Sequence, residues 1–138
     1  MIPNTILLVD DDETTNLLNK FFAESLDETI DVVTTVNGKE ALDFLEQNDI
    51  EAIGPCFIVL DVLMPVMDGW EFLAEFNKRF SDDYKKQVTI VILTGLESEK
   101  VIKQAKAHPL VHGTVQKPLS DRKFRELIAN HYVENLSQ

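Results

Sequence analysis

Residues that could hold a metal ion or act on a phosphate group follow four separate apolar runs in this sequence. These residues, each with the run that precedes it, are Asp10 and Asp11 (after residues 5–9), Asp61 (57–60), Thr94 (88–93) and Lys117 (111–115). Carboxylates supply the oxygen ligands that a hard divalent cation prefers, and Mg²⁺ also keeps waters and accepts phosphate oxygens. A carboxylate can attack phosphorus, while a hydroxyl and a lysine neutralise the phosphoryl oxygens. Brought to one place, the set would suit metal-assisted phosphoryl chemistry.

Each of these residues alone also has a structural explanation. An Asp or Thr after a strand is often a turn or cap residue, and a single Lys is usually a solvated charge. Asp12 and Glu13 complete a run of four acids and can stabilise the N-terminus of a following helix, where the helix dipole favours negative charge. A cap accounts less well for Asp10 and Asp11, which lie nearer the strand end. The sequence has no G-x-x-x-x-G-K-[ST] segment, so a nucleotide is not the expected ligand.

Apolar runs alternate with segments of helical periodicity, and these elements must position the polar set. The runs are rich in Ile and Val, as in strands buried on both faces, and we expect strands at about residues 5–9, 30–36, 56–60, 88–93 and 111–115. We expect five helices to bury, in chain order, Leu18, Phe21, Phe22 and Leu26; Ala41, Leu42 and Leu45; Phe72, Leu73, Phe76 and Phe80; Val101, Ile102 and Ala105; and Phe124, Leu127, Ile128 and His131. The fourth helix should span about residues 97–107, whereas residues 50–55 and 81–87 are predicted to be connectors.

Five strand–helix units in strict alternation predict an α/β fold with a five-stranded parallel sheet and helices on both faces. Right-handed crossovers make such a sheet doubly wound, in three layers. Binding sites in these sheets form at the carboxyl ends of the strands, which is where the polar set would lie. A length of 138 residues suits one domain, residues 1–138, with a core at about residues 5–132.

Five motifs in this order resemble the receiver domain of two-component response regulators (CheY-like proteins). They are Leu8-Val9-Asp10-Asp11, Leu60-Asp61, Met64-Pro65-x-Met67-Asp68-Gly69, Leu93-Thr94-Gly95 and Lys117-Pro118. The resemblance covers essentially the whole chain and implies a flavodoxin-like sheet of strand order 2-1-3-4-5. It implies that Asp61 is the phospho-acceptor and that Thr94 and Lys117 contact the phosphoryl group. It also implies that Mg²⁺ is held by Asp10, Asp11, Asp61 and the backbone carbonyl of Leu63.

Two positions depart from the family pattern. The family often has an aromatic switch residue three positions before the lysine, and this chain has Thr114 there. We therefore expect signalling to depend on backbone shifts in the loop from Thr94 to Glu97. Leu63 is apolar where many relatives are polar, and its side chain would flank the water that attacks the phosphoryl group.

Because no linker or second domain is visible in the sequence, we expect a stand-alone domain, and the resemblance implies a signalling domain and not an enzyme in its own right. A histidine kinase or histidine phosphotransfer protein would donate the phosphoryl group, and a downstream protein would bind the surface of the fourth helix, fifth strand and fifth helix. Homodimer formation on phosphorylation is left open. Two alternatives are a docking module that does not switch and the receiver of a hybrid sensor kinase. A phosphatase is disfavoured, because the second acid usual two residues after the nucleophile is replaced by Leu63.

The composition of the chain limits its expected partners and its cellular location to a few classes. The formal net charge of −11 disfavours direct binding to DNA or to an anionic membrane surface. No stretch approaches the roughly 20 apolar residues of a membrane span, and the N-terminus has no secretory leader pattern. Cys56 is the single cysteine, which precludes an internal disulfide and fits a reducing compartment. We therefore expect a cytoplasmic protein.

Overall fold

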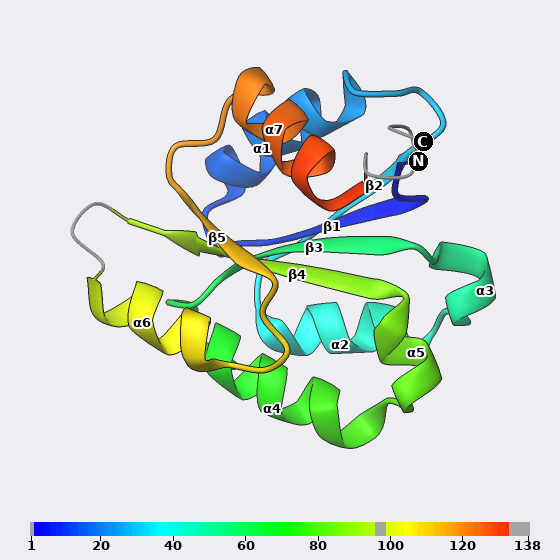
Figure 1. Cartoon of the computed structure of the whole chain (residues 1–138), viewed down its shortest axis with the longest axis vertical. Helices are drawn as coiled ribbons and strands as arrows, with labels where there is room; N and C mark the ends of the chain where they lie inside the picture. The colour runs from blue at the N-terminus through cyan, green and yellow to red at the C-terminus, as the bar shows by residue number, and fades with distance from the viewer. Residues whose placement is uncertain (1, 96–98, 133–138) are drawn as a thin grey trace.

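Five parallel strands form one sheet in the order β2-β1-β3-β4-β5 (Figure 1). The computed structural model describes residues 2–95 and 99–132. The strands are β1 (Thr5–Val9), β2 (Asp31–Thr35), β3 (Cys56–Asp61), β4 (Val88–Thr94) and β5 (Gly113–Gln116). This order and the flavodoxin-like architecture confirm the predicted fold class.

Helices cover both faces of the sheet (Figure 1). The helices α1 (Glu13–Glu24) and α7 (Asp121–Tyr132) lie on one face, and α2 (Gly38–Glu46), α4 (Gly69–Arg79) and α6 (Glu99–Ala107) lie on the other. Two short helices, α3 (Ile50–Ile53) and α5 (Asp82–Lys86), lead into β3 and β4. None of the helices in the described residues combines the length and apolarity that crossing a membrane would require.

The strands alternate their side chains between two cores. Ile6 and Leu8 of β1 pack on the side of α1 and α7, whereas Leu7 and Val9 pack on the side of α2, α4 and α6. Because the side-chain period of a strand is two, strands buried on both faces read as continuous apolar runs. That pattern is what made the central strands predictable.

The prediction of irregular connectors at residues 50–55 and 81–87 was wrong in both places. In the second segment, the Ser81 hydroxyl accepts a hydrogen bond from the Tyr84 backbone N–H and caps α5. The Tyr84 ring packs against Phe80 with the ring centroids 4.5 Å apart, and the Tyr84 hydroxyl donates to the Leu45 carbonyl. A single anchoring aromatic residue therefore folds a mostly polar segment into a helix.

The buried face of α1 differs from the predicted one. Leu18 and Phe21 are 52% and 68% exposed, and the fully buried residues of the helix are Asn16, Asn19 and Ala23. The reason is a polar contact below the helix, because the Asn16 side chain donates to backbone carbonyls at the strand ends. This contact fixes the rotation of the helix and leaves Leu17, Leu18 and Phe21 facing solvent, while Phe22 packs partly against the core.

The helices α4 and α6 lie on the same face but are anchored differently. In α4, three large side chains are fully buried, and the rings of Phe72, Phe76 and Phe80 follow one another at centroid distances of 5.9 and 5.2 Å. In α6, whose first predicted residues fall outside the described part, Ala105 is the fully buried residue and Val101 is half-buried. Thus α4 is anchored by large buried side chains and a series of aromatic rings, whereas α6 is anchored by one small buried side chain.

The last strand begins two residues later than predicted. The His112 backbone N–H donates to the Ile90 carbonyl, and its Nδ1 accepts a hydrogen bond from the Ile90 N–H over 3.0 Å. The His112 side chain thereby accepts the hydrogen bond that a backbone carbonyl of a neighbouring strand would otherwise accept from Ile90. Burial lowers the pKa of His112, which favours the neutral imidazole that this acceptor role needs.

Candidate functional site

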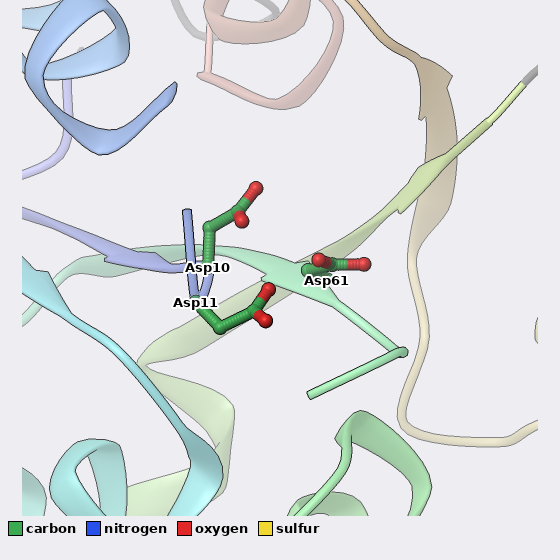
Figure 2. A group of neighbouring side chains, drawn as sticks. All are labelled: Asp10, Asp11 and Asp61. Carbon is green, nitrogen blue, oxygen red and sulfur yellow. The ribbon is translucent and has the colours of Figure 1, made fainter. Parts of the chain in front are cut away.

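Three carboxylates meet at the carboxyl edge of the sheet (Figure 2). Asp10, Asp11 and Asp61 each offer one oxygen, and these oxygens all lie within 4.8 Å of one another. The parallel pairing of Val9 with Leu60 places the ends of β1 and β3 side by side, which brings the first and last of these acids together. Asp10 and Asp61 are buried, and Asp11 is exposed.

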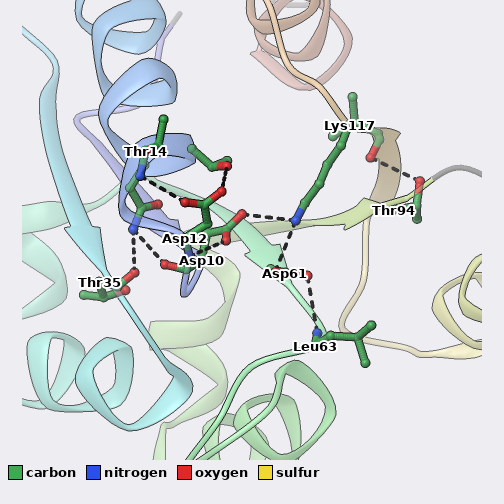
Figure 3. A network of polar contacts seen from close by, with 11 residues as sticks. Asp10, Asp12, Thr14, Thr35, Asp61, Leu63, Thr94 and Lys117 are labelled. Carbon is green, nitrogen blue, oxygen red and sulfur yellow. Dashed lines mark hydrogen bonds and ion pairs between the residues drawn. The ribbon is translucent and has the colours of Figure 1, made fainter.

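Lys117 supplies the positive charge of the cluster (Figure 3). Its Nζ lies 3.2 Å from Asp61 Oδ2 and 3.3 Å from Asp10 Oδ2. The backbone holds the lysine at this edge, because the Lys117 N–H donates to the Thr94 carbonyl over 2.8 Å. Sequence reasoning missed Lys123, whose Nζ donates to the carbonyls of Gln116 and Pro118 and so braces the segment on both sides of Lys117. Nothing in the sequence distinguishes this lysine from a solvated one.

Burial and the neighbouring charges shift the pKa values of this cluster. Burial raises the pKa of Asp61, with a further rise from Asp10, and the Lys117 charge only partly offsets the effect. Burial alone would lower the pKa of Lys117, but the two carboxylates outweigh it and raise the pKa. The ammonium group is thereby kept charged, while the Asp61 carboxylate is held in an environment that does not favour its charge.

The run of acids after β1 divides into two tasks. Asp12 is the N-cap of α1, and its side chain accepts hydrogen bonds from the Thr14 N–H and the Thr15 hydroxyl at 3.1 and 2.8 Å. Asp10 instead turns back toward the sheet, with its Oδ1 accepting from the Asp12 N–H over 2.9 Å. The cap explanation therefore holds for Asp12 and leaves Asp10 and Asp11 for the carboxylate cluster.

The loop between β3 and α4 is held closely against the site. The Leu63 N–H donates to Asp61 Oδ1 over 3.3 Å, and the Leu63 side chain is 79% exposed. Val66 has a φ of 68°, in the left-handed region that a β-branched residue seldom occupies. A Cβ on Gly69 would lie 2.8 Å from the Asp61 carbonyl, so the glycine permits α4 to start directly against the end of β3.

A contact that the sequence did not reveal fixes the far side of this loop. The Gly38 N–H donates to the Met67 carbonyl over 3.0 Å, and a Cβ on Gly38 would lie only 2.8 Å from Met67 Cγ. The turn before α2 and the loop after β3 therefore touch through a position that only glycine fits. Asn37-Gly38 is a typical turn sequence, but nothing in the sequence indicates that it contacts Met67, 29 residues further along the chain.

Thr94 shares a cavity with the acidic cluster. The cavity has a volume of about 440 Å³ and is lined in part by Asp61, Leu63, Thr94 and Lys117. The Thr94 hydroxyl donates to the Val115 carbonyl over 3.3 Å (Figure 3). The structure thus brings together all of the predicted side chains, with the threonine hydroxyl turned toward β5. The predicted signalling loop from Thr94 to Glu97 lies largely outside the described residues.

The donor set fits a hard divalent cation. Three carboxylate oxygens within reach of one another, of which one side chain is exposed, match the preference of Mg²⁺ for a few carboxylates together with water and phosphate oxygens. Within the described residues this is the one group of three or more side chains that could hold a metal ion. Its residues and the adjoining cavity could therefore accommodate a cation and a phosphoryl group together.

Comparison with known proteins points to one family. The family model described as "Response regulator receiver domain" matches residues 6–129. A probable C4-dicarboxylate response regulator, DctR of Halalkalibacterium halodurans, is 30% identical over 98 residues, which cover 71% of this chain and 38% of that protein. The autoinducer 1 sensor kinase/phosphatase LuxN of Vibrio harveyi is 25% identical over 131 residues, covering 95% of this chain and 14% of that protein. This chain therefore spans well under half the length of either relative.

Solved structures show the same fold. The crystal structure of a two component response regulator from Cytophaga hutchinsonii superposes with a TM-score of 0.79 at 23% identity and covers 100% of both chains. The chemotaxis response regulator CheY4 of Vibrio cholerae gives a TM-score of 0.74, also at 23% identity, over 93% of this chain and 98% of the other. At this level of identity the likeness concerns the fold.

Proposed function

Because the chain belongs to the family of response regulator receiver domains, signalling domains of two-component systems that are not classical enzymes, we propose that Asp61 accepts a phosphoryl group from a phosphohistidine protein. The observation that carries the proposal is the carboxylate cluster itself. Asp61 stands at the carboxyl end of the central strand, within 4.8 Å of two further acids and in contact with one lysine. A histidine kinase or a histidine phosphotransfer protein is the proposed donor.

The transfer step follows from the positions of the groups. An Asp61 oxygen forms a bond to phosphorus as the bond from phosphorus to the donor imidazole nitrogen breaks, and the imidazole leaves with the electron pair of that bond. Asp10, Asp11, Asp61 and the Leu63 carbonyl would hold Mg²⁺, which when bound neutralises charge on the phosphoryl oxygens. Lys117, already 3.2 Å from Asp61, would contact a second phosphoryl oxygen.

Thr94 is the proposed link between phosphorylation and shape. Thr94 lines the cavity beside Asp61, but its hydroxyl donates to the Val115 carbonyl over 3.3 Å, which is long for a hydroxyl hydrogen bond. A phosphoryl oxygen on Asp61 offers a charged acceptor in the same cavity, and charge-assisted hydrogen bonds are the stronger kind. We therefore infer that the hydroxyl exchanges partners on phosphorylation and releases its hold on β5.

The surface beside the site suits a protein donor. Leu17 and Phe21 of α1 are mostly exposed, and an apolar cavity of about 170 Å³ lies between this helix and the Lys117-Pro118 segment. Large exposed apolar side chains in a cluster usually mark a contact surface. A donor bound to α1 at this place would present its phosphohistidine to the acid edge. The surface formed by α6, β5 and α7 remains our proposed contact for a downstream protein.

Intact mass after incubation with acetyl phosphate tests the acceptor. We expect wild-type protein to gain one phosphoryl group in the presence of Mg²⁺ and none after chelation, and Asp61→Asn to gain none. Asp68→Asn is a matched control, because Asp68 is a nearby acid that caps α4 and lies outside the carboxylate cluster. Equal labelling of Asp61→Asn would show that another residue is the acceptor, and no labelling of the wild type would favour a docking module that does not switch.

A place in a hybrid sensor kinase is the second candidate. The match to LuxN covers 95% of this chain within a sensor kinase/phosphatase, whereas the match to DctR covers 71% within a response regulator. The proposed chemistry at Asp61 is the same in both settings, and only the source of the phosphoryl group differs. Transfer from a separate phosphotransfer protein, faster than from acetyl phosphate, would favour the response regulator.

A further inference from the structure

A buried asparagine joins the ends of two strands beneath the acidic pair. Asn16 is only 5% exposed, and its Nδ2 donates to the Asp10 carbonyl over 2.8 Å and to the Thr35 carbonyl over 3.0 Å. The Asp10 N–H also donates to the Thr35 carbonyl, over 3.1 Å. The backbone of Asp10 is therefore fixed on both sides, at its N–H and at its C=O.

The hydrogen bond from Asn16 to the Asp10 carbonyl also affects Asp11, the next residue in the chain. The Asp10 carbonyl belongs to the peptide plane that joins Asp10 to Asp11, so holding this carbonyl fixes where the N and Cα atoms of Asp11 lie, and with them the point from which the Asp11 side chain leaves the backbone. Asp11 is exposed, so little side-chain packing is available to hold it in place. A metal ligand must be held to within a fraction of an ångström, and the neighbours of a ligand usually provide that precision.

Asparagine is a costly residue for this position if packing were its only role. The Asn16 Oδ1 is buried and, among the described residues, has no hydrogen-bond partner. A buried polar atom without a partner lowers stability, and an apolar side chain of similar size would avoid that penalty. The use of both amide hydrogens on two strand-end carbonyls is the feature that an apolar residue could not reproduce.

We propose that Asn16 is a positioning residue for the Mg²⁺ site, which it serves by orienting the Asp10–Asp11 peptide through its side-chain amide. The inference rests on the proposed function, because it assumes that the acidic pair binds the metal. It predicts that loss of the amide weakens Mg²⁺ binding in a protein that remains folded. A role in stability alone would lower the melting temperature and leave the metal affinity unchanged.

The test is calorimetric titration of Mg²⁺ into the unphosphorylated wild type, Asn16→Leu and Asn16→Ser. Leu is similar in size to Asn and removes the amide donors. Ser is a smaller polar residue and provides a second variant in case Asn16→Leu does not fold. Asn19→Leu is the control, because Asn19 is another buried asparagine one turn along the same helix. We expect the Mg²⁺ Kd to rise about tenfold in the folded Asn16 variants, as for other residues that orient metal ligands, and to stay unchanged in Asn19→Leu.

The outcomes separate the inference from the proposed function. A wild-type Kd in either folded Asn16 variant, with or without a lower melting temperature, overturns the positioning role and leaves the proposed function intact. An equal loss of affinity in Asn19→Leu also overturns it, because the effect would then be general to the helix. A wild-type protein that binds no Mg²⁺ overturns both the inference and the metal part of the proposed function.

Discussion

The Lys117 ammonium lies 3.2 Å from Asp61 Oδ2, so the lysine is already paired with the proposed acceptor before any phosphoryl group arrives. The same ammonium lies 3.3 Å from Asp10 Oδ2. One side chain thus bridges the end of β1 and the end of β3, and it is the cation that offsets the repulsion between their carboxylates. Removing it should expose that repulsion directly.

Lys117→Met is expected to destabilise the protein in the absence of divalent cations. The side chain is one-third exposed, so we place the loss in the free energy of unfolding between surface and buried ion pairs, at about 1–3 kcal/mol. Mg²⁺ should then raise the melting temperature more in the variant than in the wild type, because it replaces the missing charge. Thermal melts with and without Mg²⁺ check this. Lys39→Met, which breaks an exposed pair with Asp43, should change little, and an equal effect of both substitutions would contradict the prediction.

Asp61→Asn is expected to stabilise the protein near neutral pH by on the order of 1 kcal/mol, because it removes a charge from a buried site kept for function. Burial raises the pKa of Asp61, so the folded state binds the proton more tightly than the unfolded state does. The stabilisation that comes from the protonated Asp61 carboxyl is therefore complete below the unfolded-state pKa of about 3.9. It is lost as the pH rises through the higher folded-state pKa of Asp61. Denaturant unfolding at a series of pH values above 4 should show a less steep fall in the variant. Parallel curves for the two proteins would contradict this account.

Gly38→Ala is expected to lower the free energy of unfolding by about 1–3 kcal/mol, although alanine is the better helix former. The added Cβ would lie 2.8 Å from Met67 Cγ and 3.0 Å from the Met67 carbonyl oxygen. A double-mutant cycle with Met67→Ala measures the side-chain part of this clash. We expect Gly38→Ala to cost less in the Met67→Ala background, with a remainder due to the carbonyl. Strictly additive effects would show that the two residues do not oppose each other.

Replacing both Leu17 and Phe21 by Gln is expected to slow phosphoryl transfer from a histidine phosphotransfer protein without slowing labelling by acetyl phosphate. Both side chains are mostly exposed, so the free energy of unfolding should stay within about 0.5 kcal/mol of wild type. The measurement is the initial rate of Asp61 labelling with each donor. Val66, also mostly exposed but in the loop after β3, provides a Val66→Gln comparison. Equal rates with the protein donor would place its contact elsewhere.

The strands could be located because buried parallel strands appear as continuous apolar runs, and their order was implied by the resemblance to receiver domains. Asp61, Thr94 and Lys117 needed only their places in the chain to be assigned to one edge. Contacts between residues distant in sequence could not be predicted in this way. The pairing of Gly38 with Met67 depends on how two loops meet, and the grip of Asn16 on Thr35 depends on how a helix is rotated. The same rotation explains why the predicted inner face of α1 was wrong at Leu18 and Phe21.

Because α4 and α6 are anchored unequally, a structural change at the site should affect one of these helices more than the other. A change at Thr94 reaches the chain at the end of β4, just before α6, and it meets a helix whose fully buried side chain is a single alanine. At the end of the neighbouring α4, the Phe80 ring packs on Tyr84 of α5, and the Tyr84 hydroxyl donates to the Leu45 carbonyl near the end of α2. We therefore expect a change at the acid edge to move α6 more readily than α4. In amide hydrogen exchange the difference would appear as earlier opening of residues 99–107 than of residues 69–79.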